Sequence, residues 1–279
     1  MKRIKVSYSI RNNFGNSLNP LIFNRILGVN IEWASPFECD MTAIGSGLRL
    51  MYRTPQKMAE YLNGEAYLGS HRLCCIWSSG FLDTPTGEEL AVRPNTLFSL
   101  VRGELSRKNL ELIHGMPIDI PTADAGLLAS ELINKQPIKY TLGIIPHIRE
   151  ISEMEYIKLI SNIPGSTLID VREDPITITK KIAQCQCIIS SSLHGLVVAD
   201  SLGVPNKRVV LTNKLLGDGF KFNDYYSAFG VASEYIDLRQ NCVIHLNDIV
   251  SSYRITEAQV CRKKQLILDA FNDVLAALS

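Results

Sequence analysis

The stretch 187–206 constrains the fold of this chain more than any other part of the sequence. It opens with a short apolar run, passes through three consecutive serines, continues as the apolar segment Leu196–Leu202 and closes with Gly203 and Pro205. The opening run is too short for a buried helix and is typical of a buried parallel strand. Serine caps helix N-termini, glycine and a following proline end helices, and a new apolar run begins at Val209. The stretch therefore predicts a strand, a serine turn, a helix and a second strand.

His194 lies at this predicted turn, where the carboxyl end of a strand meets the N-terminus of a helix. Ligands of open α/β sheets bind at that edge, and the positive end of the helix dipole favours anions there. A histidine near its ordinary pKa can act as an acid or a base. We therefore predict that His194 is catalytic. The alternative is a histidine that only packs or caps the helix.

The run Ser-Ser-Ser-Leu-His-Gly-Leu-Val-Val-Ala-Asp-Ser-Leu-Gly-Val-Pro-Asn, at 190–206, resembles the signature of the polysaccharide pyruvyl transferase family. Shorter segments are similar to other parts of the family pattern: Asn-Phe-Gly-Asn at 13–16, Trp-Ser-Ser-Gly-Phe at 77–81, Val-Arg-Gly at 101–103, Ile-Pro-His at 145–147 and Phe-Lys-Phe-Asn-Asp-Tyr-Tyr at 220–226. The resemblance implies an enzyme that moves the enolpyruvyl unit of phosphoenolpyruvate onto sugar hydroxyls and leaves a pyruvate ketal. It also implies that Ser190, Ser192 and Leu193 bind the substrate beside the catalytic histidine.

The chain departs from the family pattern at three of these positions. Ser78 stands where the family's Trp-Gly-x-Gly-Phe turn has its first glycine. Asn16 stands where an Asp is usual, so that any acidic role there is lost, although an amide still forms hydrogen bonds. Ser192 stands where some relatives have an Arg. If that Arg holds the donor, another group must hold it here, and the backbone N–H groups at the helix N-terminus are candidates.

Charge and composition exclude several functional classes. Lys and Arg total 29 against 28 Asp and Glu, a formal net charge of +1, which argues against bulk binding of nucleic acid. No apolar run reaches the length of about 18 residues that a membrane span needs. The first residues are charged and lack a signal-peptide core, which predicts a cytoplasmic protein. The 7 cysteines are odd in number, which favours reduced core thiols over a disulfide framework.

Two glycine-containing turns of the N-terminal half follow predicted strands. Gly45-Ser46-Gly47 comes after the predicted strand Asp40–Ile44, and such glycines allow the backbone to approach a ligand closely. Arg102 follows the predicted strand Leu97–Val101 and precedes a helix, where it can hold a phosphate or carboxylate bidentately. We predict that Gly45, Ser46 and Arg102 bind substrate. The alternative for Arg102 is an ion pair with a carboxylate such as Glu104.

Asn16 belongs to a similar turn near the N-terminus, which predicts a helix Leu18–Ile26 capped by Ser17 or by Asn16 itself. The resemblance places Asn16 among the substrate-binding residues. The alternative is that it only caps the turn.

Two candidate residues follow in the C-terminal half. His147 comes directly after the predicted strand Tyr140–Ile145 and Pro146, again at a carboxyl end. Lys221 lies between two phenylalanines on what the flanking glycines predict to be a loop, and an ammonium group binds phosphate as a point charge. Both are predicted to bind substrate. The alternatives are a turn histidine, and a solvated lysine between two core phenylalanines.

Strands alternate with helices through both halves, and the buried strands are typical of parallel sheets. We predict an α/β fold of two Rossmann-like domains, 1–134 and 135–279, facing each other across a cleft. This is the GT-B-like arrangement that the resemblance also implies. A polar linker at 134–139 separates the two, helices are expected at Glu153–Ser161 and Thr256–Leu278, and the terminal helix is expected to brace the N-terminal domain.

The resulting hypothesis is a polysaccharide pyruvyltransferase with phosphoenolpyruvate as donor and a glycan, lipid-linked or free, as acceptor. The scheme requires no metal and no other cofactor. One alternative is a nucleotide-sugar glycosyltransferase of the same fold, although residues 140–279 lack the pair of glutamates seven residues apart that many such enzymes carry. Another is a carbohydrate-binding protein without catalysis. No Gly-x-Gly-x-x-Gly follows the first predicted strand, which argues against a dinucleotide enzyme.

Overall fold

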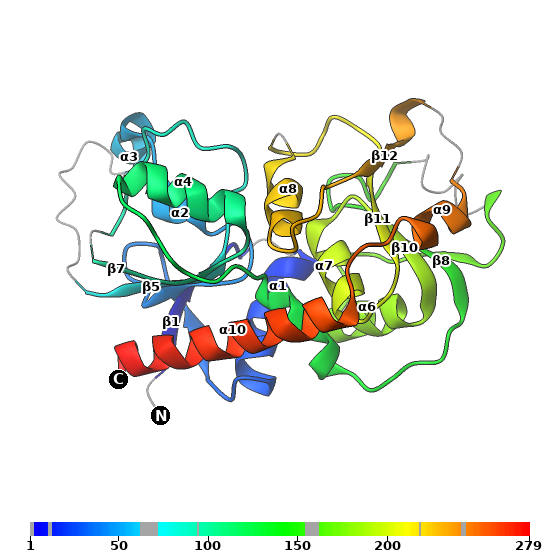
Figure 1. Ribbon diagram of the computed structural model, residues 1–279, viewed down its shortest axis with the longest axis horizontal. Coiled ribbons are helices and arrows are strands. Elements are labelled where there is room, and N and C mark those ends of the chain that lie inside the picture. The colour runs from blue at the N-terminus through cyan, green and yellow to red at the C-terminus, as the bar shows by residue number, and fades with distance from the viewer. Residues whose placement is uncertain are drawn as a thin grey trace.

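The computed structural model describes residues 3–10, 13–61, 72–93, 95–153, 162–217, 219–240 and 244–279. Two five-stranded parallel sheets dominate it, and helices lie around both (Figure 1). The first sheet takes its strands from residues 4–101 and the second from residues 140–237. The chain is therefore α/β with parallel sheets, as the alternation of strands and helices predicts.

In both five-stranded sheets, every pair of neighbouring strands is parallel. The first sheet has the order β2 (Ile31–Trp33), β1 (Ile4–Ser7), β3 (Met41–Thr42), β5 (Cys74–Ser79), β7 (Thr96–Val101). The second has the order β12 (Tyr235–Asp237), β11 (Asn206–Val210), β10 (Cys185–Ser190), β8 (Tyr140–Ile145), β9 (Ser166–Leu168). A small antiparallel pair joins β4 (Tyr52–Arg53) to β6 (Leu90–Ala91). Since parallel strands end at one edge, each sheet gathers the loops that follow its strands.

The helices are α1 (Phe14–Arg25), α2 (Leu48–Met51), α3 (Pro55–Tyr61), α4 (Glu104–His114), α6 (Pro175–Ala183), α7 (Leu193–Ser201), α8 (Phe220–Ser227), α9 (Leu246–Ser251) and α10 (Glu257–Leu278), with 3-10 turns η1 (Ala125–Leu132) and η2 (Leu238–Gln240). None of the helices in the described ranges is long and apolar enough to cross a bilayer.

Both faces of the first sheet are buried, which is why β5, beside the edge strand β7, is apolar from Cys74 to Trp77. Cys75 and Trp77 point into one hydrophobic cluster, whereas Cys74 and Ile76 point into another on the opposite face. Alternate residues of a strand point to opposite faces, so that a strand covered on both faces has no polar side.

The C-terminal helix α10 crosses under the first sheet and reaches the centre of the molecule (Figure 1). The indole Nε1 of Trp77 donates to the carbonyl of Ile267 at 3.1 Å, and the hydroxyl of Ser99 donates to the carbonyl of Ala270 at 2.7 Å. Thr256 caps the helix with a capping box. The helix thus ties the last residues of the described chain to β5 and β7.

Three sequence predictions of local structure need correction. Helix α1 begins at Phe14, because the side chain of Asn13 accepts the N–H of Gly15 at 3.3 Å and caps it. Helix α7 begins at Leu193 rather than at Leu196, because the first turn is formed by the buried motif residues themselves, including His194. Phe220 and its neighbours form helix α8 rather than a loop, because Phe220 and Phe222 are buried.

Other predicted elements compare as follows. Strand β8 has the predicted bounds, and α10 begins one residue after the predicted Thr256. The predicted helix Glu153–Ser161 lies, apart from its first residue, outside the described residues.

Candidate active site

A cavity of about 620 Å³ lies where the carboxyl edges of the two sheets meet. From the first sheet come residues that follow β1 and β3, and from the second come residues that follow β8 and β10, joined by α8. Its polar and charged lining residues are Ser9, Asn13, Asn16, Ser46, Arg49, His147, Arg149, Ser192, His194 and Lys221. The sequence predictions for Asn16, Gly45, Ser46, His147, Ser192, Leu193, His194 and Lys221 therefore converge on one cavity, whereas Arg102 and Ser190 are not among its lining residues.

His194 is the second residue of α7 and is buried where the helix N-terminus faces the cavity. Gly15 of α1 lies directly against its ring: a Cβ at that glycine would be 2.0 Å from Nδ1. Burial lowers the pKa of His194, and nearby Arg102 and Lys221 lower it further, while Asp124 acts in the opposite direction. The imidazole is therefore neutral near pH 7 and can accept a proton.

Among the ion pairs of the described residues, the one that includes His194 is formed with Asp124. Its Oδ2 lies 3.7 Å from Nε2 of His194, and both side chains are buried. The sequence places Asp124 in a polar turn after β7, and nothing in the sequence alone connects that turn to His194.

His147 faces the same cavity from the loop after β8. Its Nδ1 accepts the backbone N–H of Arg149 at 3.2 Å, which leaves the proton of the neutral ring on Nε2. Burial, followed by the charges of Lys221 and Arg149, lowers the pKa of His147 to about 4. The ring is therefore neutral at pH 7, and it can donate a hydrogen bond from Nε2.

Lys221 is buried in the first turn of α8 while still lining the cavity. Burial and the nearby guanidinium groups of Arg102 and Arg208 lower its pKa to about 8. The two flanking phenylalanines are core residues, as the alternative interpretation predicts, but the lysine is not solvated. A buried ammonium at this position is favoured by an anion in the cavity.

Arg102 lies behind the cavity wall in a fully buried ion pair with Asp224 of α8. The sequence suggested Glu104 as an alternative partner of Arg102. In the structure Arg102 pairs with Asp224, and Glu104 pairs with Arg107. The guanidinium still reaches the cavity lining, because its Nη1 donates to the hydroxyl of Ser46 at 3.3 Å.

Ser190 and Ser192 have different roles in the turn before α7. The hydroxyl of Ser190 accepts the N–H of Ser192 at 2.9 Å and lies 3.0 Å from the carbonyl oxygen of Ile145, so that it stabilises the turn. Ser192 is the N-cap residue, with no side-chain cap hydrogen bond, and it lines the cavity with Leu193. The first N–H groups of a helix have no intrahelical partner, which makes this end suited to an anion.

A sequence model described as polysaccharide pyruvyl transferase matches residues 3–206. The chain belongs to this family. Among curated proteins, an uncharacterized protein of Acanthamoeba polyphaga mimivirus is 31% identical over 188 residues, which are 63% of this chain and 65% of that protein. The succinoglycan biosynthesis protein ExoV of Rhizobium meliloti is 26% identical over 133 residues, 47% of this chain and 40% of that protein. The chain thus spans less than two thirds of the length of either relative.

The family turn at 77–81 explains one unusual backbone conformation. Ser78 stands where the family turn has its first glycine, and its φ of 65° lies in the left-handed region that glycine adopts without strain. Its hydroxyl accepts the N–H of Ala125 and lies 3.4 Å from the carbonyl oxygen of Ala123. Gly80 in the same turn lies against the Arg102 guanidinium, where a Cβ would be 2.4 Å from Cζ.

Four functional candidates were missed by the sequence interpretation. Arg49 and Arg149 line the cavity as exposed cations, and Asn13 lines it while capping α1. Asp124 approaches His194 from outside that lining. Arg49 lies three residues beyond Ser46 and Arg149 two residues beyond His147, but sequence spacing does not show which side of a turn faces the cavity. No cluster of three metal-ligating side chains occurs within the part of the chain that the structure describes.

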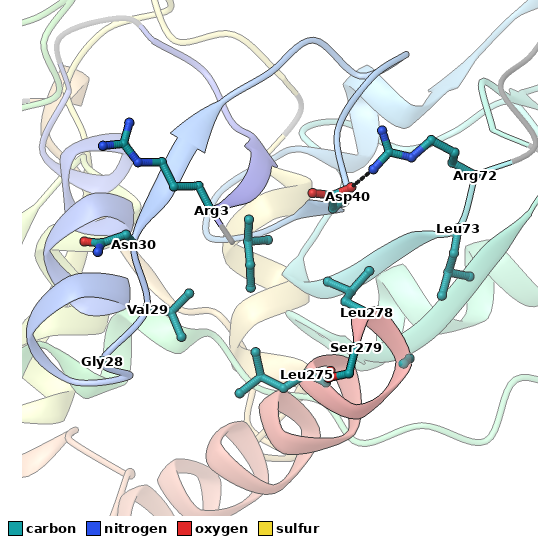
Figure 2. Close-up of a pocket in the computed structure, with 12 residues that line it drawn as sticks. Arg3, Gly28, Val29, Asn30, Asp40, Arg72, Leu73, Leu275, Leu278 and Ser279 are labelled. Atoms are coloured by element: carbon teal, nitrogen blue, oxygen red, sulfur yellow. Dashed lines mark hydrogen bonds and ion pairs between the residues drawn. The ribbon is translucent and has the colours of Figure 1, made fainter. Parts of the chain in front are cut away.

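A second cavity, of about 540 Å³, lies at the opposite edge of the first sheet. Figure 2 shows Leu275 and Leu278 of α10 below it and the ion pair of Arg72 with Asp40 at its side, at 2.8 Å. The lining includes residues that precede β3 and β5, so that it belongs to the amino ends of the strands. It is therefore separate from the candidate active site.

Proposed function

We propose that this protein transfers pyruvate from phosphoenolpyruvate onto two hydroxyls of a sugar in a surface polysaccharide or its precursor. The observation that carries the proposal is the His194 cavity. A family member brings its signature histidine to a helix N-terminus at the carboxyl edge of a parallel sheet, in a cavity that Lys221, Arg49 and Arg149 also line. Cations and a helix N-terminus suit a donor with a carboxylate and a phosphate.

The proposed reaction balances as follows. The methylene carbon of phosphoenolpyruvate gains a proton and becomes the methyl group, while one sugar hydroxyl loses its proton and bonds to the adjacent carbon. The second hydroxyl then bonds to that carbon as the C–O bond to phosphate breaks, and its proton leaves with phosphate. His194, neutral at pH 7, is proposed to exchange a proton with the methylene carbon or with an acceptor hydroxyl.

The other predicted residues are proposed to bind the donor or acceptor. Lys221 and the first N–H groups of α7 suit the phosphate, and the Nε2–H of His147 is available to an oxygen of either substrate. Arg49 and Arg149 are candidates for the charge that an Arg at the position of Ser192 supplies in some relatives. Asn16, Gly45 and Ser46 complete the wall that faces α7.

We also propose that the two halves of the chain, 1–134 and 135–279, are Rossmann-like domains in a GT-B-like arrangement. It is supported by the two parallel sheets, whose strands fall on either side of the segment 134–139, and by a cavity lined from both. Packing of α10 against β5 and β7 supports bracing of the first domain by the terminal helix. We place the reaction in the cytoplasm, with membrane contact only through a lipid-linked acceptor.

The test is incubation of the purified protein with phosphoenolpyruvate and a panel of lipid-linked and free glycans. We expect phosphate release that depends on acceptor, together with a mass gain on the glycan that corresponds to one ketal-linked pyruvate. A parallel reaction with nucleotide sugars in place of phosphoenolpyruvate should give no glycan product. Glycosyl transfer in that reaction would contradict the proposal, and so would glycan binding without phosphate release across the whole panel.

A further inference from the structure

Asp124 is held rigidly beside the candidate active site. It is the N-cap of η1, and its Oδ1 accepts the N–H of Gly126 at 2.8 Å. The side chain is fully buried, and η1 packs against α7, the helix that carries His194. One carboxylate oxygen is therefore committed to the cap, and the cap fixes where the other one points.

The second oxygen of Asp124 points at the imidazole of His194. Its Oδ2 lies 3.7 Å from Nε2, and each of these two atoms is buried without a hydrogen-bond partner within the described ranges. Buried polar atoms of this kind usually find a partner, because leaving one unsatisfied costs about 1–3 kcal/mol. A hydrogen bond between Oδ2 and Nε2–H would satisfy both atoms at once.

We propose that Asp124 is a positioning residue for His194, accepting a hydrogen bond from Nε2–H and so leaving Nδ1 to exchange the proton with substrate. This inference rests on the proposed function. Nδ1 lies on the side of Gly15, in the segment 13–16 that contributes Asn13 and Asn16 to the cavity. A carboxylate that fixes the tautomer and orientation of a catalytic imidazole also stabilises the charged ring that forms during proton transfer.

The charges around His194 give this carboxylate a specific electrostatic role. Burial and the cations Arg102 and Lys221 all lower the pKa of the imidazole, and Asp124 is the group that raises it. Without Asp124, the ring would be a weaker base in a cavity whose lining is cationic. The carboxylate thus keeps the histidine basic enough to take a proton while Lys221 holds the anionic donor.

Asp124→Asn tests the proposal, because asparagine caps a helix as well as aspartate does, while it removes the charge and replaces the second acceptor oxygen by an amide NH₂ that cannot accept from Nε2–H. We expect the limb of the pH–rate profile that belongs to His194 to move to lower pH by about one unit. We expect kcat to fall about 10–100-fold, the range for losing a hydrogen-bond partner that orients a metal-binding histidine, while the KM for phosphoenolpyruvate changes little. The matched control is Asp174→Asn, since Asp174 caps α6 by accepting the N–H of Thr177 at 2.9 Å on the exposed surface. That control should leave the profile unchanged.

A second measurement does not depend on turnover. Nitrogen-15 NMR of the histidine-labelled wild-type protein, with the His194 signals assigned by their loss in His194→Ala, reports which ring nitrogen carries the proton. We expect Nε2–H in the wild type and a shifted titration of the same signals in Asp124→Asn. An Nδ1–H ring in the wild type would overturn the proposal, as would an Asp124→Asn protein whose His194 titration matches the wild type. If no glycan supports phosphate release from phosphoenolpyruvate, the proposed function fails, but the NMR titration still decides whether Asp124 positions His194.

Discussion

Arg102 and Asp224 form a fully buried ion pair that joins the two halves of the chain, with Nε of the guanidinium 2.9 Å from Oδ2 of the carboxylate. The Asp224 carboxylate also accepts two hydrogen bonds from Ser106 in the first turn of α4, one from its backbone N–H at 2.7 Å and one from its side-chain hydroxyl at 2.6 Å. The carboxylate of α8 therefore binds both a buried cation and a helix N-terminus. The pair fixes α8, and with it Lys221, against the strand edge that carries Ser46.

Arg102→Ala should lower the free energy of unfolding by about 3–5 kcal/mol, because it leaves the Asp224 carboxylate buried without its cation. Denaturant unfolding measures this change. Arg107→Ala is the matched control, since Arg107 forms partly exposed pairs with Glu104 and Glu111 that are worth about 0–1 kcal/mol.

The predicted role of Arg102 in donor binding is measured separately, in the folded variant. Calorimetry with phosphoenolpyruvate should show affinity weakened by about 1.5–3 kcal/mol, the range for hydrogen bonds to charged groups. Arg102→Lys should recover only part of the lost affinity, because lysine lacks the planar guanidinium that binds an anion through two N–H groups. A folded Arg102→Ala protein with wild-type donor affinity would limit this residue to structural support.

His194→Ala should lower the rate of phosphate release by about 10²–10⁴-fold, the usual contribution of general acid–base catalysis. The variant should remain folded and should still bind phosphoenolpyruvate, because Lys221 and the first N–H groups of α7 remain. His245→Ala, at an exposed N-cap position of α9, is the control and should keep full activity. Turnover within a few-fold of wild type in a folded His194→Ala protein would transfer the acid–base role to His147.

Gly15→Ala should reduce activity strongly although alanine is a better helix former than glycine. Gly15 lies inside α1, where the change would ordinarily stabilise by about 1 kcal/mol. Here the added Cβ would lie 2.0 Å from Nδ1 and 2.5 Å from Cγ of His194, so that the imidazole must move. Steady-state kinetics measures the loss of activity, and circular dichroism checks that the variant keeps its helices. Asn24→Ala, on the exposed face of α1, is the control. Wild-type kcat in Gly15→Ala would show that the ring position is not critical.

Asp200 should make stability depend on pH. It lies on α7, where burial raises its pKa to about 7, although its oxygens accept from Asn206 Nδ2 at 2.6 Å and from Tyr225 OH at 2.8 Å. The folded pKa lies above the unfolded value of about 3.9, so that folding favours the protonated carboxyl. The free energy of unfolding should therefore fall as pH rises from about 4 to about 7, each unit of displaced pKa being worth about 1.4 kcal/mol.

The contribution of Asp200 is isolated by comparison with Asp200→Asn. Urea unfolding at a series of pH values should show a smaller decrease for the variant than for the wild type over that window. Asp174→Asn is again the control, since Asp174 is exposed on α6. Parallel curves for wild type and Asp200→Asn would mean that Asp200 stays ionised in the folded protein throughout.

Turnover should persist in a metal chelator, because the proposed scheme neutralises the donor with protein cations. Lys221, Arg49 and Arg149 line the cavity and can meet the phosphate and carboxylate charges directly. Phosphate release is measured with and without chelator, and then after addition of magnesium. Loss of activity that a divalent cation restores would contradict this prediction.

The sequence predicted the repeating strand–helix order because apolar periodicity and turn residues are local signals. Tyr140–Ile145 and the strand–turn–helix around His194 follow from a few adjacent residues each, and parallel strands must bring the loops at their carboxyl ends to one edge. That is why so many of the predicted site residues line a single cavity.

Tertiary packing decided what those residues contact. The partner of Arg102 is 122 residues away in the sequence, on a helix that was predicted to be a loop, and Asp124 reaches His194 from a turn after the other sheet. Such pairs form where separate elements are pressed together around a shared apolar core, in which buried charges must find partners. The amino-acid sequence indicates which residues are charged and which are buried. The distances between those residues are set by how the two sheets and their helices pack.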